Sequence, residues 1–305
     1  MTQAARAAIA VAPEVAAARA AERPVVALET SIVAQGLPWP TNLEVAREMT
    51  AAVRAAGAVP ALTAVVGGAV RVGLDDATVE TLARQGAAKA SARDLARLAC
   101  TGADGATTVA ATLRIARAAG IAVLATGGIG GVHRDAGGFD VSADLDELAA
   151  SRTVVVASGA KSILDLPRTL EWLEMRGVPV LGWRTERFPA FYVVDSGLAV
   201  PPIDEVATVA AIARRHWALG GGGLLLAQAP PVPLPGDAVE AWTARALARA
   251  ADAGVSGAAT TPFLLAELAR LSDGATLAAN RALAVANARL AADLAVALAC
   301  GPAEA

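Results

Sequence analysis

Short apolar runs alternate with longer amphipathic stretches over most of the 305-residue chain. The runs have the length and apolar content of buried strands, and they lie at 24–28, 121–125, 153–157, 178–183 and 223–227. The amphipathic stretches have the spacing of helices, and they lie at 41–57, 75–85, 92–100 and 107–119. This alternation of strands and helices predicts an α/β fold.

Turn and capping signals refine the outline at three places. Thr41 and Glu44 have the spacing of a capping box, which predicts that a helix begins there. Residues 59–72 have the pattern of a hairpin, with the glycine pair 67–68 at its turn. From residue 236 onward nearly the whole chain has a helical pattern, so we expect the C-terminal part to be helical.

Composition and charge exclude several classes of protein. A net charge of −3 provides no basic field for nucleic acid, and Cys100 and Cys300 make neither a disulfide framework nor a zinc cluster. No window holds about 18 unbroken apolar residues, and residues 1–23 lack the pattern of a secretory signal, so we expect no membrane span. Because no repeat or linker divides the sequence, we expect a single cytoplasmic domain over residues 1–305.

The basic residues are almost all arginine. Of the 26 lysines and arginines, only Lys89 and Lys161 are lysine. A surface cation can usually be of either type, so a chain that uses arginine so widely retains lysine where arginine fails, or else by chance. Lysine, unlike arginine, can lose its proton and act as an amine nucleophile or form a Schiff base. Both lysines are therefore candidate functional residues.

Polar residues follow directly after three of the predicted strands. Glu29 ends the first of them, Thr126 follows the second, and Lys161 closes the turn after the third. In α/β proteins this edge of the sheet binds ligands, because loops and helix N-termini converge there. The glycines of 126–131 let the backbone approach a ligand, although their spacing is not the dinucleotide fingerprint and a tight structural turn is the alternative. His133 follows this loop.

Four further places carry candidate chemistry, each with a structural alternative. Asp140 and Asp144 flank a serine and could hold a hydrated divalent cation, while Asp144 could equally cap a helix. Lys89 stands beside a serine and an arginine at a predicted helix start, a combination that suits phosphate. The threonines at 107–108 either cap the next helix or bind phosphate. Asn280 lies in a helical pattern, where solvent exposure is the alternative to a functional role.

In this order, the motifs resemble those of the pseudouridine-5′-phosphate glycosidases, also called the indigoidine-synthase-A-like family. The resemblance covers about residues 24–295, and it depends on many ordered segments rather than on any one of them. The matching segments lie at 29–31, 35–40, 89–95, 105–110, 125–133, 139–145, 159–166, 261–265 and Asn280.

The resemblance implies a three-layer α/β/α fold with a mixed central sheet, assembled as a homotrimer. It also implies reversible cleavage of the C–C glycosidic bond of pseudouridine 5′-phosphate to uracil and ribose 5-phosphate, with a divalent metal, usually Mn²⁺. Lys161 would be the nucleophile, Glu29 the proton donor and Asp140 the residue that serves the metal through water. The expected substrate-binding residues are Lys89, Thr107, Thr108, Val109, Thr126, His133, Ser142, Ala143, Asp144 and Asn280.

The chain departs from the family pattern in places, and two other functions stay open at this point. Gln228 stands where the family usually has asparagine, Ala259 replaces a commonly acidic residue, and the loop between His133 and Phe139 is short. A Schiff-base phosphosugar aldolase would also use a strand-end lysine, but it predicts a barrel of regular βα units. A non-catalytic sugar-phosphate-binding protein would need the phosphate contacts without an uncharged lysine.

Overall fold

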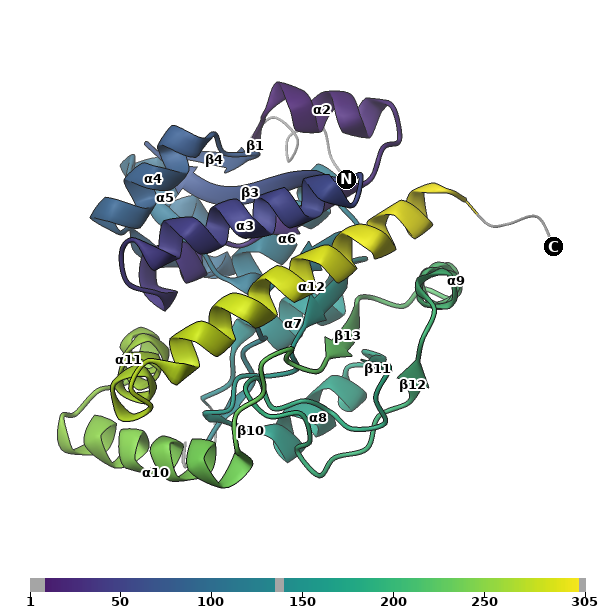
Figure 1. Ribbon diagram of the computed structural model, residues 1–305. Coiled ribbons are helices and arrows are strands. Elements are labelled where there is room, and N and C mark those ends of the chain that lie inside the picture. Colours follow the sequence, from purple (N-terminus) through teal and green to yellow (C-terminus); the bar gives the residue numbers. More distant parts are fainter. Residues whose placement is uncertain (1–8, 135–139, 302–305) are drawn as a thin grey trace.

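A computed structural model describes residues 9–134 and 140–301 of the protein. Its centre is an 11-stranded mixed sheet in the order β1-β4-β3-β2-β7-β9-β13-β11-β12, with β6 paired to β3 and β5 paired to β6 (Figure 1). The strands of this sheet are β1 (Ile9–Val11), β2 (Val25–Leu28), β3 (Val59–Val66), β4 (Ala69–Val72), β5 (Ala88–Ala90), β6 (Gly105–Thr107), β7 (Val123–Ala125), β9 (Val154–Ala157), β11 (Val180–Trp183), β12 (Pro202–Ile203) and β13 (Leu224–Gln228). Residues 135–139, which include Phe139 and most of the loop predicted to be short, lie outside the described residues.

Helices cover both faces of the sheet. On one face α12 lies across β2, β7 and β9 beside α3, and on the other face α6 and α7 lie together (Figure 1). The helices are α2 (Pro13–Ala20), α3 (Thr41–Ala55), α4 (Asp76–Gln85), α5 (Leu95–Thr101), α6 (Val109–Ala119), α7 (Ala143–Ala150), α8 (Leu166–Met175), α9 (Val206–Ala218), α10 (Gly236–Asp252), α11 (Thr260–Leu271) and α12 (Ala275–Ala299), with short turns η1 (Ile32–Gly36), η2 (Ala92–Asp94) and η3 (Gly257–Ala259). The predicted three-layer fold with a mixed sheet and a helical C-terminal part is confirmed.

Three central strands run parallel and end at the same edge of the sheet. Leu28 of β2 lies opposite Ala125 of β7, and Ala125 lies opposite Val156 of β9. Helices cover both faces of these strands, which explains why their sequences are continuous apolar runs rather than alternating ones. The residues that directly follow the three strands therefore come together, as the sequence predicts.

Two predicted helix starts differ in detail from the structure. The helix predicted to begin at Thr41 does begin there, as α3, but Thr41 does not cap it, because Pro40 occupies the cap position; Glu44 instead accepts a hydrogen bond from Arg281 at 2.7 Å. The helix predicted from residue 107 begins at Val109, because the residues before it pair with β3 and β5 as the strand β6. For α6, pairing with distant strands therefore determines where the helix starts.

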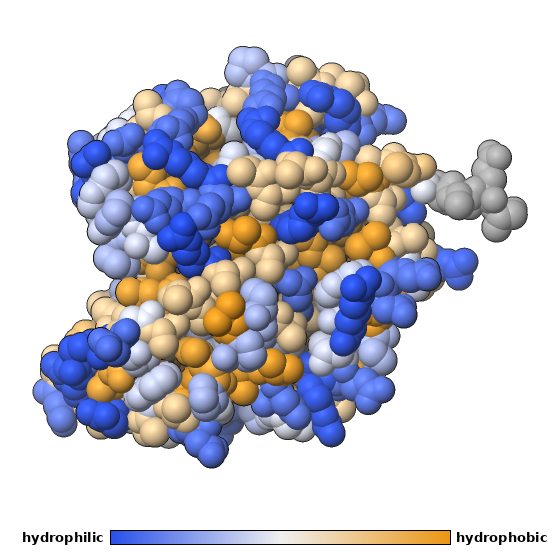
Figure 2. Space-filling model, viewed as in Figure 1, coloured by the Kyte–Doolittle hydropathy of each residue, from blue (hydrophilic) through white to orange (hydrophobic). Residues whose placement is uncertain are grey.

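The C-terminal helix α12 is long and apolar enough to cross a membrane by length and composition alone, with a mean hydropathy of 1.6 in its most apolar window. Half of that window is buried inside the protein, against the sheet and against α3 and α9. Figure 2 shows apolar side chains along this helix as a band between charged regions. These contacts are typical of a core helix.

Candidate active site

A cavity of about 450 Å³ opens at the edge of the sheet where β2, β7 and β9 end. Two predicted site residues lie beneath its surface: Thr107 is fully buried and its hydroxyl donates to the Thr63 carbonyl at 2.7 Å, and Thr126 is also buried. The other predicted site residues line the cavity, and they are Glu29, Lys89, Thr108, Val109, His133, Asp140, Ser142, Ala143, Asp144, Lys161 and Asn280.

Neutral donors hold the carboxylate of Glu29. The Thr126 hydroxyl donates to Oε1 at 2.9 Å, while the Ile32 backbone N–H donates to Oε2 at 3.3 Å and the Ser31 hydroxyl donates to the same oxygen. The side chain lines the cavity although only 6% of the residue is exposed. The hydroxyl of Thr126, predicted to bind substrate, is thus engaged in orienting Glu29.

Lys161 closes a turn that backbone hydrogen bonds fix to the neighbouring glycine-rich loop. The Ile129 N–H donates to the Gly159 carbonyl, and the Lys161 N–H donates to the Ile129 carbonyl, both at 3.1 Å. Gly159 has a φ of +70°, and a Cβ there would lie 1.9 Å from the Pro189 carbonyl oxygen. Only glycine fits this position. The turn therefore determines the point from which the lysine side chain enters the cavity.

Both lysines of the chain line the same cavity, although Lys89 lies on β5 and Lys161 follows β9. Within residues 9–134 and 140–301, neither lysine forms an ion pair. Burial lowers the pKa of Lys89 below its ordinary 10.5, and the charge of Lys161 lowers it further, against the opposing effect of three carboxylates. Two lysines that form no ion pair among the described residues can hydrogen-bond an anion bound in the cavity.

The N-terminus of α6 forms another wall of the cavity, with Thr108 as its N-cap. The carboxylate of Asp144 accepts the N–H groups of Ala110 and Gly130, each at 2.8 Å, and so joins this helix to the glycine-rich loop. A Cβ at Gly130 would lie 2.8 Å from that carboxylate. Asp144 is therefore not a helix cap, since Ser142 caps α7.

Two asparagines of α12 face the site. Asn280 lines the cavity, is 5% exposed rather than solvated, and its Oδ1 has no hydrogen-bond partner among the described residues. Asn287, seven residues later on the same helix, donates to the carbonyls of Thr126 and Gly127 at 2.9 and 3.2 Å and to the Ser158 hydroxyl at 3.2 Å. It holds together the two loops that carry the site, although it is not among the residues predicted from the sequence.

His133 and Asp140 lie at one side of the cavity. The backbone N–H of His133 donates to the backbone carbonyl of Asp140 at 2.9 Å. Burial lowers the pKa of the His133 imidazole below 6.5, while the carboxylate of Asp140 opposes the shift. Among the described residues, no three His, Cys, Asp or Glu side chains come together as a metal site. Asp140 is exposed, so a divalent ion bound to its carboxylate would retain most of its waters.

Other lining residues carried no signal of their own. Phe191 lies between β11 and β12, has a φ of +62°, and packs its ring where a Cβ of Gly128 would lie. Gln35 and Thr261 belong to segments that match the family motifs, but nothing in the sequence gave them a role.

The two substitutions that depart from the family pattern, at Gln228 and Ala259, lie in other elements. Gln228 ends β13 and Ala259 lies in the short turn η3. Neither residue is part of the cavity lining in the described portion of the chain.

An α/β sheet whose edge gathers two lysines, a helix N-terminus and a buried carboxylate defines an anion-binding α/β protein equipped for amine and acid–base chemistry. Residues 14–297 match the model of the family described as indigoidine synthase A like protein, and the chain belongs to that family.

Related proteins and solved structures align with nearly the whole chain. Proteins named pseudouridine-5′-phosphate glycosidase are similar: the one from Herpetosiphon aurantiacus is 53% identical, covering 94% of this chain and 97% of its own, and the one from Methylobacterium nodulans is 52% identical, covering 94% and 87%. The crystal structure of the prealnumycin C-glycosynthase in complex with ribulose 5-phosphate has a TM-score of 0.89 at 41% identity, covering 97% and 99%. An indigoidine synthase A-like protein from Thermotoga maritima has a TM-score of 0.88 at 35% identity, covering 95% and 96%.

Proposed function

We propose that the protein is a pseudouridine-5′-phosphate glycosidase, a lyase that reversibly cleaves the C–C glycosidic bond to give uracil and ribose 5-phosphate. The observation that carries the proposal is that the only two lysines of the chain line one cavity and lack ion-pair partners among the described residues. The names of relatives about half identical to this chain support the same reaction.

The bond to be broken explains why a lysine is needed. The leaving group is a carbon, so protonation of a leaving oxygen, which a pair of carboxylates normally supplies in glycosidases, does not apply. The C1′–O4′ bond of the ribose ring breaks, O4′ takes a proton, and an uncharged Lys161 amine bonds to C1′ and loses a proton. The C–C bond then breaks toward uracil, whose carbon takes a proton, and water hydrolyses the resulting imine. Glu29 assists ring opening and transfers the proton.

In this proposal the phosphate binds at the wall of the cavity that carries Lys89. Lys89 supplies the charge, and Ser91 and Arg93, which also line the cavity, lie beside it at the start of η2. The N-terminus of α6, with Thr108 and Val109, offers partial positive charge to the same anion. Binding energy from this remote group orients the sugar over the amine.

The proposal includes a divalent ion, Mn²⁺, held by Asp140 through water. Such an ion would supply Lewis-acid polarisation of a substrate oxygen. The sugar and the base would be bound by His133, Ser142, Ala143 and Asn280. The Oδ1 of Asn280, which has no partner among the described residues, would accept a hydrogen bond from the substrate. We further propose that the enzyme acts in the cytoplasm as a homotrimer.

The rival functions make different predictions. The mixed open sheet is not the barrel of regular βα units that the aldolase alternative predicts. A sugar-phosphate-binding protein without catalysis would bind the substrate and release nothing.

One assay separates these readings: the protein is incubated with pseudouridine 5′-phosphate and Mn²⁺, and uracil is measured by liquid chromatography. We expect uracil and ribose 5-phosphate in equal amounts. Cleavage of ketose phosphates without uracil release would support the aldolase, and calorimetric binding without turnover would support the binding protein.

A further inference from the structure

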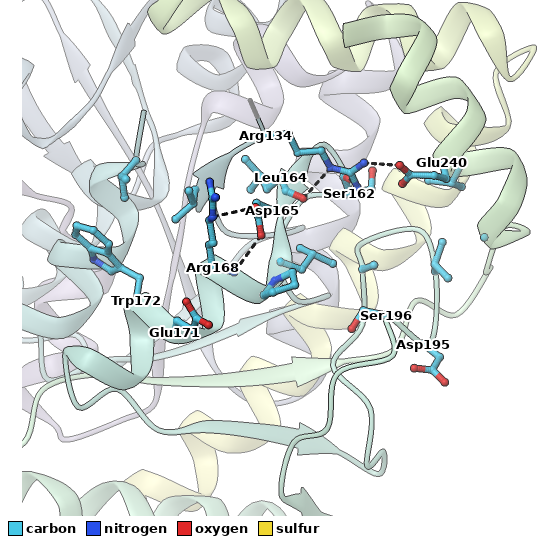
Figure 3. Close-up of a pocket in the computed structure, with 18 of the residues that line it drawn as sticks. Arg134, Ser162, Leu164, Asp165, Arg168, Glu171, Trp172, Asp195, Ser196 and Glu240 are labelled. Carbon is cyan, nitrogen blue, oxygen red and sulfur yellow. Dashed lines mark hydrogen bonds and ion pairs between the residues drawn. The ribbon is translucent and has the colours of Figure 1, made fainter. Parts of the chain in front are cut away.

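A second cavity, a groove of about 1300 Å³, is lined in part by Ser162 and Leu164, which follow Lys161 in the chain (Figure 3). The two cavities are separated by a ribbon of β8 (Val132–His133) and β10 (Leu164–Asp165), in which His133 lies opposite Leu164. His133 lines the active-site cavity, while Val132 and Arg134 line the groove, as alternation along a strand requires.

Arg134 reaches from the end of β8 to the chain that follows Lys161. Its Nη2 donates to the Ser162 carbonyl at 2.9 Å, and its Nε donates to the Leu164 carbonyl at 3.1 Å. Its Nη1 pairs with Glu240 of α10 at 2.5 Å. Figure 3 shows the guanidinium between these three groups. The guanidinium of Arg134 thus bridges two backbone carbonyls of the turn that follows Lys161 and the carboxylate of Glu240 on α10.

These contacts complete the fixation of the Lys161 turn. On the active-site side, the Lys161 N–H is held by Ile129, and the Leu164 N–H donates to the Lys161 carbonyl at 3.0 Å. On the groove side, Arg134 holds the Ser162 and Leu164 carbonyls. The fork of the guanidinium fixes two carbonyls in one geometry, which the single ammonium of a lysine cannot reproduce.

We infer that Arg134 is a positioning residue for Lys161, and that Glu240 orients the Arg134 guanidinium. The inference rests on the proposed function, because it concerns the amine that attacks the sugar. Arg134 is not among the residues that line the active-site cavity. Its loss therefore displaces the nucleophile while the phosphate-binding wall around Lys89 stays intact, so kcat falls and KM changes little.

The test compares Arg134→Met and Arg134→Lys with a matched control, Arg168→Met. Arg168 lines the same groove, but its side chain pairs with Asp165 of its own turn, at 3.5 Å. We expect Arg134→Met to lower kcat about 100-fold, the scale of a displacement near 1 Å, with KM within about threefold. Arg134→Lys should retain about tenfold more activity than the methionine variant, and the control should lie within about twofold of the wild type.

Chemical rescue provides a readout that a general structural role would not move. In Arg134→Ala the open groove leaves room for a small guanidinium, so millimolar methylguanidine should restore part of kcat. Methylguanidine should leave the Arg168→Ala control unchanged. Melting temperatures of all variants are measured in parallel, and Glu240→Gln, at an exposed residue, replaces the Arg134 variants if these do not fold; its kcat should fall about threefold.

The outcomes separate the inference from the proposed function. A wild type that releases no uracil overturns both. An active wild type together with an Arg134→Met variant of unchanged kcat, or one impaired through KM alone, overturns the positioning role and leaves the proposed function in place. If only Glu240→Gln can be studied, unchanged kcat in that variant likewise overturns the positioning role.

Discussion

The cavities on the two sides of the β8–β10 ribbon differ in how their basic side chains are paired. In the larger groove the arginines are paired with carboxylates of the protein, Arg134 with Glu240 and Arg168 with Asp165. In the smaller cavity Lys89 and Lys161 have no such partner among the described residues, and Glu29 is held by hydroxyl and amide donors rather than by a cation. Lysines without an ion-pair partner among the described residues, and not volume, thus distinguish the cavity that we propose binds the phosphate.

The largest effect is expected from Lys161→Arg. Arginine keeps the positive charge but cannot supply an uncharged amine, so turnover should fall at least about 10⁴-fold, the scale of losing a catalytic nucleophile. Uracil release measures turnover, and circular dichroism checks that the fold is retained. Near-normal turnover by this variant would refute the assigned role.

A slightly smaller loss is expected from Glu29→Ala. Removing the proton donor should lower kcat about 10²- to 10⁴-fold, the range of general acid–base catalysis, while ribose 5-phosphate still binds through the intact phosphate wall. Calorimetry measures this binding. If the variant no longer binds ribose 5-phosphate, Glu29 contributes to the structure of the cavity rather than to proton transfer.

Next in size is Lys89→Met, which removes a cation from the phosphate wall and leaves the Lys161 turn untouched. The loss of a charged hydrogen bond, about 1.5–3 kcal/mol, should raise KM about 10- to 100-fold with a smaller change in kcat. Steady-state kinetics with pseudouridine 5′-phosphate measure both constants. A fall in kcat alone would place Lys89 in the chemistry instead.

The smallest effect is a pH dependence of KM above neutrality. Burial and Lys161 lower the pKa of Lys89, so this side chain loses its proton at a lower pH than an ordinary lysine does. Phosphate affinity should therefore weaken, and KM rise, as the pH increases through that lowered pKa and before 10.5 is reached. Lys89→Arg stays charged and should show a flat profile. Equal slopes in the two proteins would exclude Lys89 as the titrating group.

The edge of the sheet could be predicted from the sequence because parallel strands align their own ends. Glu29 and Lys161 each follow a continuous apolar run, and such runs lie side by side in an α/β sheet. The scarcity of lysine indicated the same two side chains that the structure brings together at the cavity. The local apolar pattern and the topology of the sheet therefore indicate the same edge.

Contacts that depend on distant packing could not be predicted in this way. Asp144 lies in the first turn of a helix, where the sequence is equally compatible with a capping role. In the structure its carboxylate accepts hydrogen bonds from the N–H groups of Ala110 and Gly130. The contact of Arg134 with Glu240 depends on where α10 packs. The contact of Phe191 with Gly128 depends on the course of the loop after β11. Asn287 did carry a signal, since the chain has only three asparagines and this one lies seven residues after Asn280.

Reductive trapping tests the central claim most directly, since Lys161 and Lys89 are the only lysines that can be labelled. The protein is incubated with ribose 5-phosphate and borohydride, digested, and its peptides are weighed by mass spectrometry. We expect the pentose phosphate adduct on Lys161 and none on Lys89. Uracil release from pseudouridine 5′-phosphate by a protein whose Lys161 stays unmodified in this experiment would contradict the account.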